Sequence, residues 1–148
     1  MTAYKFTKAQ LNEIHKGMRS VIDQNIYARP CYDSCQMEQI RLGLEEGLDV
    51  SSFADRDLDW MQMSQLRKGI GNGVDVRAGI EEHIRRSGLE GMSIRDYDAW
   101  QLCLVREAME DRMPQDLVER CMDPSLDIEK VASLFEKIEQ EARRYERN

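Results

Sequence analysis

Two stretches of the sequence decide the fold: CQMEQIRLGLEEGLDV at residues 35–50 and MQMSQLRKGIGNGVDV at residues 61–76. They align without gaps, and their glutamines, Gln36 and Gln62, stand 26 residues apart. A third stretch, AQLNEIHKGM at residues 9–18, aligns with both at the same spacing. Self-similarity at a fixed period is typical of helical repeat proteins, in which each copy is one supersecondary unit.

Two further copies extend the pattern toward the C-terminus. A fourth begins at Trp100, and an extra segment at residues 80–92 separates it from the third. A fifth, more divergent copy starts at Asp127. We therefore predict one domain over residues 1–148, and its units cover residues 7–32, 33–58, 59–97 with an inserted helix at 76–87, 98–126 and 127–147.

The repeated residues carry signals for the start and the end of a helix. A Thr or Asp three residues before a Gln fits a capping box, in which each side chain bonds the backbone N–H of the other residue. Gly47 and Gly73 follow the apolar stripe and fit the left-handed position that ends a helix. The predicted capping pairs are Thr7–Gln10, Asp33–Gln36, Asp59–Gln62 and Asp98–Gln101.

A second, shorter helix is expected to follow each long one. Asp49 and Asp75 are placed to cap it; it is barely a turn at 50–54, whereas after Asp75 it becomes the inserted helix. We expect an all-α protein of tandem two-helix repeats of about 26 residues, because no unit of this size buries its apolar stripe alone. A short α-solenoid and a repeat-derived closed bundle both satisfy this pattern.

From Asp127 the sequence predicts one long final helix. A capping helix that closes the last repeat's core explains its apolar stripe, and a coiled-coil seam of a homodimer is the alternative. The stripe consists of Ile128, Val131, Phe135, Ile138, Ala142 and Tyr145.

The stretch from Gln36 to Ala54, with its echo from Gln62 to Val76, carries a family resemblance. It is similar to tandem short helical repeats of uncharacterised proteins from Gram-positive, often gut-dwelling, bacteria and their mobile elements. The pattern there is Gln-Met-x-x-Ile-Arg-x-Gly-Leu-x-x-Gly-Leu-Asp-Val, followed by an aromatic residue and Ala. The resemblance implies a helical array in a bacterial cytoplasm and implies no catalytic activity.

One basic residue recurs beside each apolar stripe, and we interpret it as a ladder of interaction residues. Arg presents a rigid bidentate fork, which suits anions and peptide carboxylates. The structural alternative is that each Arg pairs with a repeat aspartate, Asp23, Asp49 or Asp75, and ties one unit to the next. The ladder consists of His15, Arg41, Arg67 and Arg106.

Trp60 and Trp100 open their helices, so they are expected either to pack against the neighbouring unit or, if exposed, to anchor a partner. The basic residues His83, Arg85 and Arg86 lie on the inserted helix. Nearby acidic residues favour a solvated helix face there. An insertion that breaks the repeat is nevertheless a candidate for an acquired function.

No constellation for catalysis, a cofactor or a metal stands out. Cys31 and Cys35 are four residues apart, but Cys35 takes a repeat position that is Met61 in the next copy. Such interchange indicates packing and argues against zinc, which needs paired Cys and His spacings. We find no phosphate-binding glycine loop, nucleophile elbow or zinc-protease motif.

The composition narrows the remaining function classes. With 41% hydrophobic and 33% charged residues the chain suits a folded domain, and its formal charge of −7 weakens attraction to phosphate backbones. We see no signal-type or membrane-spanning segment, and expect four reduced cysteines in the cytoplasm. The sequence favours a non-enzymatic scaffold or adaptor that binds another protein, and a nucleic-acid-associated regulator of a mobile element is the alternative.

Overall fold

The computed structural model describes residues 5–147, apart from the side chains of Ile128, Tyr145 and Arg147. All regular structure in this range is helical, and the range contains no strand. The chain divides into two compact units, Met1–Gly71 and Asn72–Asn148. The boundary falls within the third predicted repeat, directly before the inserted helix.

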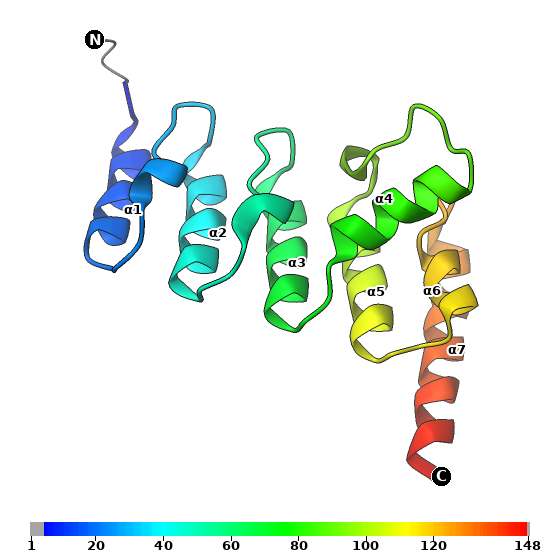
Figure 1. Ribbon diagram of the computed structural model, residues 1–148. Helices are drawn as coiled ribbons and strands as arrows, with labels where there is room; N and C mark the ends of the chain where they lie inside the picture. The colour runs from blue at the N-terminus through cyan, green and yellow to red at the C-terminus, as the bar shows by residue number, and fades with distance from the viewer. Residues whose placement is uncertain (1–4, 148) are drawn as a thin grey trace. The chain divides into compact units, whose positions relative to one another are not determined.

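The first unit contains three α-helices and two short 3-10 turns. They are α1 (Lys8–Met18), η1 (Gln24–Ile26), α2 (Ser34–Glu45), η2 (Val50–Ser52) and α3 (Trp60–Gly71). α2 packs against both α1 and α3. Within this unit the three helices run side by side in the same direction, and the chain returns through η1 and η2 (Figure 1).

The second unit contains the remaining helices. They are α4 (Val76–Arg86), η3 (Ile94–Asp96), α5 (Ala99–Glu110), α6 (Gln115–Cys121) and α7 (Ile128–Arg147). α5 packs against α4 and α6, and α7 packs against α6. The inserted helix predicted at 76–87 and the final helix predicted at 127–147 are therefore both present to within one residue.

Each repeated glutamine joins its own helix to the start of the following one. The Gln36 side chain completes the Asp33 capping box through Oε1, and its Nε2 donates to the carbonyl of Leu58 at 2.7 Å. Gln10 does the same with Thr7 and with the carbonyl of Tyr32, also at 2.7 Å. A buried amide that satisfies both of its ends in this way holds the intervening loop in place.

Three of the four predicted capping boxes form, and the fourth is wrong. Asp98 makes no side-chain cap hydrogen bond, although Gln101 still donates through Nε2 to the carbonyl of Asp123 at 2.7 Å. η3 ends only two residues before Asp98, so the chain has less room to turn this carboxylate back over the helix end.

The final helix buries a different stripe from the one we predicted. Leu134 and Ile138 are buried, whereas Phe135 is exposed, so the stripe through Phe135 is wrong at that position. Leu134 replaces it because a step of three residues from Val131 turns the helix toward α6, as the packing of α6 on α7 requires. The predicted members Ile128 and Tyr145 have side chains outside the described set.

Left-handed residues end the helices, as the glycines predict. Gly47 has φ 74° and Gly73 has φ 86°. Leu48 N–H donates to the carbonyl of Gly43 at 2.9 Å, which completes a Schellman motif after α2. After α5 the same motif places Arg112 at φ 54°.

Replacing Arg112 with glycine is therefore expected to stabilise the second unit by about 0.5–1 kcal/mol, because glycine adopts a positive φ without a Cβ clash. Asp111→Gly is the matched control, since Asp111 has φ −80° and gains nothing from glycine. That variant should lose about 0.5–1 kcal/mol. Urea unfolding followed by Trp100 fluorescence measures both. Equal shifts in the same direction would contradict the assignment of strain to Arg112.

Candidate functional site

The repeated arginines of the first unit each reach back to the preceding helix. Arg41 on α2 donates from Nε to Glu13 on α1 at 2.9 Å and from Nη1 to Glu45. Arg67 on α3 donates from Nε to Gln39 on α2 at 3.0 Å. Arg67 also pairs with Glu46 at 2.8 Å. These side chains fasten neighbouring helices together.

The predicted aspartate partners are therefore wrong. Asp23, Asp49 and Asp75 instead accept hydrogen bonds from backbone N–H groups two or three residues further on, at the starts of η1, η2 and α4. The arginines lie in mid-helix and face the neighbouring helix, where glutamate and glutamine side chains are within reach. The ion pair that ties one helix to the next was anticipated, but not its acceptor.

Burial and charge partners act in opposite directions on Arg41. Burial disfavours its charge, but hydrogen bonds and attraction from Glu13 and Glu45 outweigh that effect and raise the pKa of Arg41. The pKa of Glu45 is lowered, since hydrogen bonds from Arg41 and Ser20 outweigh the effect of its own burial. The Arg41 guanidinium is thus committed to two carboxylates and is not presented to a ligand.

The other two members of the proposed ladder differ from Arg41 and Arg67. Arg106, in the second unit, forms a bidentate pair with Glu110 on its own helix, at 2.9 Å for each oxygen. His15 is exposed on α1. The structure places His15, Arg41 and Arg67 on three successive helices of one unit, and Arg106 in the other unit.

The basic residues of the inserted helix are paired with acidic ones. Arg85 and Arg86 both form ion pairs with Glu82, and Arg86 also reaches Glu119 on α6 at 2.6 Å. His83 is half-buried beside Asp116, Glu119 and Asp123 in a surface hollow. This arrangement agrees with a solvated face, and Arg86 additionally links α4 to α6.

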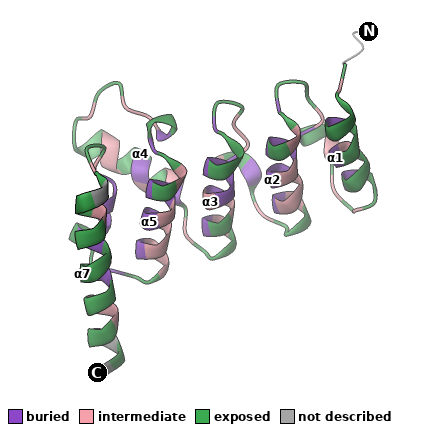
Figure 2. Cartoon of the chain, turned by 180° about the vertical axis from the view of Figure 1, so that it is seen from behind, coloured by how far each residue is buried: buried purple, intermediate pink, exposed green. Residues whose placement is uncertain are grey.

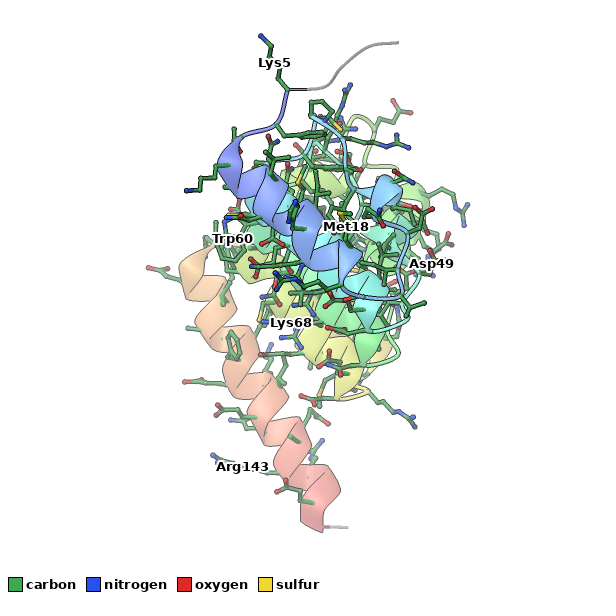
Figure 3. The ribbon with its side chains drawn as sticks, turned by 90° about the vertical axis from the view of Figure 1, so that its left-hand side faces the viewer. Lys5, Met18, Asp49, Trp60, Lys68 and Arg143 are labelled. Atoms are coloured by element: carbon green, nitrogen blue, oxygen red, sulfur yellow. The ribbon has the colours of Figure 1, made fainter. Side chains whose placement is uncertain are left out.

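Both tryptophans are substantially exposed. Trp60 keeps 44% of its surface and Trp100 keeps 43%. Met61, beside Trp60, is also exposed. Within the first unit, Trp60 lies on the opposite side from Asp49, which caps η2 (Figure 3). An exposed aromatic residue next to an exposed methionine is suited to contact with a partner.

A further apolar surface, which the sequence analysis did not single out, lies on α1. Leu11 is 45% exposed, whereas Met37 and Met63, each 26 residues further along, are fully buried. Met18, one helix face with Leu11, is also exposed, as is Val21. Most of α1 is exposed (Figure 2). We call Leu11, Met18 and Val21 the α1 edge.

The repeat alignment contained a signal for the α1 edge. Leu11 occupies the stripe position that Met37 and Met63 occupy, so its burial depends on a helix packed against the other side of α1. α2 has such a neighbour in α1, and among the described helices α1 packs against α2 alone. A stripe residue in the first aligned copy is therefore the place to look for an uncovered apolar surface.

The cysteines lack the features of reactive thiols. Burial raises the pKa of the Cys121 thiol to about 11. The pKa of Cys103 is also raised, mainly by burial and then by Glu107. A nucleophilic cysteine requires the opposite shift. In residues 5–147 no three His, Cys, Asp or Glu side chains are grouped so that they could hold a metal ion.

Comparison with known proteins identifies no matching family model, no matching curated protein and no matching solved structure. The site must therefore be interpreted from its own chemistry. Over the described residues, no helix combines the length and the apolar character needed to cross a lipid bilayer.

Proposed function

We propose that this chain is a tandem helical-repeat protein, of solenoid type, that works as a non-enzymatic scaffold or adaptor and binds another protein through the α1 edge. The recurring glutamine joints and the Arg41 and Arg67 contacts, each equivalent at a spacing of 26 residues, support the repeat. A bacterial, cytoplasmic protein is part of this proposal, on the basis of the resemblance and the cysteines.

The observation that carries the proposal is the contrast between Leu11 and its counterparts. A residue that is fully buried in α2 and α3 is 45% exposed in α1. Covering an apolar side chain of this kind contributes about 1.5–3 kcal/mol. An unoccupied stacking position is thus a ready surface for an amphipathic helix of a partner, which would take the place that α1 takes beside α2.

Charge complementarity specifies the partner helix further. Arg41 receives an acidic side chain, Glu13, from the helix that precedes it. His15 is the corresponding basic residue of α1, at 41 minus 26 in the alignment. We expect the partner helix to present apolar residues to Leu11 and Met18 and a glutamate or glutamine to His15.

Affinity capture from a lysate of the encoding organism tests this function. The wild-type chain is expected to retain one dominant protein, and Leu11→Ser/Met18→Ser to lose it by about tenfold or more, since each apolar contact contributes about one factor of ten. Asn12→Ser/Arg19→Ser is the matched control, because both residues are exposed on the same helix or its cap. Circular dichroism verifies that each variant keeps its helices.

Two outcomes would contradict the proposal. Equal recovery by both double variants would show that the α1 edge is not the binding surface. Recovery that disappears on nuclease treatment would favour the alternative of a nucleic-acid-associated regulator. Sedimentation of the purified chain separates a partner from self-association, including the homodimer through α7.

A further inference from the structure

A surface hollow in the second unit gathers basic side chains that have no acidic partner. It lies where α6, the connection after it and α7 meet, and encloses about 290 Å³. Arg120 comes from the last turn of α6, and Lys130 and Lys137 come from α7. Leu126 and Leu134 supply the apolar part of its lining.

The geometry of α7 explains why two lysines face the same hollow. Lys130 and Lys137 are seven residues apart, which is close to two turns of an α-helix, so they lie on one side. Leu134, between them on that side, is buried. Arg120 completes the group from the neighbouring helix, which packs directly against α7.

These three cations differ from the repeated arginines. Arg41, Arg67 and Arg106 each meet a carboxylate within 3 Å. Arg120, Lys130 and Lys137 form no ion pair with any side chain in the described range. Like charges that converge without a counter-charge disfavour the folded state, so their convergence on one hollow calls for an anion.

One carboxylate, Asp123, also lines the hollow. Hydrogen bonds from the backbone and the hydroxyl of Ser125 lower its pKa, and so does the charge of Lys130, so Asp123 is ionised at neutral pH. Three cations and one anion leave two positive charges in excess. A phosphate monoester carries about −1.5 to −2 at pH 7 and balances that excess.

We propose that this hollow binds a phosphate monoester. Arg120, Lys130 and Lys137 contact its oxygens, the Ser133 hydroxyl donates a further hydrogen bond, and Leu134 contacts the body of the ligand. The phosphate belongs either to a small molecule or to a phosphorylated side chain of a protein. Because the whole chain carries a formal charge of −7, affinity depends on these local contacts and not on the overall field.

Isothermal titration calorimetry on the full chain tests the site with phenyl phosphate as the probe. Benzoate, with the same ring and a single charge, is expected to bind at least about tenfold more weakly. Lys130→Gln/Lys137→Gln should weaken phenyl phosphate binding by about a hundredfold, since each charge-assisted contact contributes about tenfold. Lys130→Arg/Lys137→Arg should retain it.

The control variant removes the same charge elsewhere. Lys8 and Lys68 are exposed on α1 and α3, so Lys8→Gln/Lys68→Gln should bind phenyl phosphate like the wild type. Binding should also weaken below about pH 6, where the phosphate monoester takes up its second proton. A short phosphoserine peptide, titrated in parallel, separates the sources: tighter binding than phenyl phosphate assigns a protein ligand, and weaker binding a small molecule.

Three results would overturn the proposal. The first is the absence of binding by wild-type protein at millimolar phenyl phosphate. The second is an equal loss in both glutamine double variants, which would show a general charge effect. The third is benzoate binding as tight as that of phenyl phosphate, which would remove the preference for a dianion.

Discussion

Arg41→Met is expected to lower the free energy of unfolding of the first unit by about 3 kcal/mol, because it leaves Glu13 buried without its main counter-charge. The side chains of Arg41 and Glu13 are only 12% and 7% exposed, and their contact is 2.9 Å. Glu13 would keep only the contact with Lys16, whose side chain is largely exposed. Urea unfolding in a Trp100→Phe background measures this, since Trp60 then reports on the first unit alone.

Two further variants separate this ion pair from a general effect of charge. Glu13→Gln should cost only about 1 kcal/mol, because an amide still accepts the hydrogen bond. Gln39 already accepts from Arg67 in this way at 3.0 Å. Arg85→Met should cost less than about 0.5 kcal/mol, since its pair with Glu82 is exposed. A similar cost for Arg41→Met and Arg85→Met would contradict the importance of the buried pair.

Gly43→Ala is expected to destabilise the first unit by about 2 kcal/mol, because the added methyl group overpacks a closed contact. A Cβ at Gly43 would lie 2.5 Å from Cζ of Phe53 and 3.1 Å from Cγ1 of Val50. Phe53 is fully buried, so its ring has no free space to move into. Denaturation in the Trp100→Phe background gives the change in free energy.

Gly71→Ala is the matched control for the glycine prediction. The nearest side-chain atom to a Cβ at Gly71 is 3.7 Å away, which is ordinary contact. Alanine favours a helix over glycine by up to about 1 kcal/mol, so this variant should be neutral or more stable. A gain in both variants would show that Phe53 does not restrict the position.

The local elements could be predicted from the sequence because their signals are local. The Asp33 cap, the left-handed Gly47 and the start of the inserted helix at Asp75 each depend on residues within a few positions of one another. The exception is Asp98, which has the same spacing to its glutamine but forms no cap. There the preceding η3 turn constrains the backbone, and a two-residue pattern does not include that constraint.

The candidate sites were less predictable because they depend on packing. The contact from Arg41 to Glu13 spans 28 residues and exists only once α1 lies against α2. The hollow with Arg120, Lys130 and Lys137 requires two helices to meet at one level. No spacing within one segment reports such a meeting. The exposure of Leu11 was accessible from the alignment, since it asks only which stripe has a neighbour.

The glutamine joints make the architecture easy to enlarge in evolution. Gln10 and Gln36 each need only their own cap residue and one backbone carbonyl 22 residues ahead, and every amino acid supplies a carbonyl. A duplicated gene segment would therefore bring its own fastening with it and would demand no compensating change in the neighbouring copy. The number of copies can then drift by recombination, while selection acts on the surface residues.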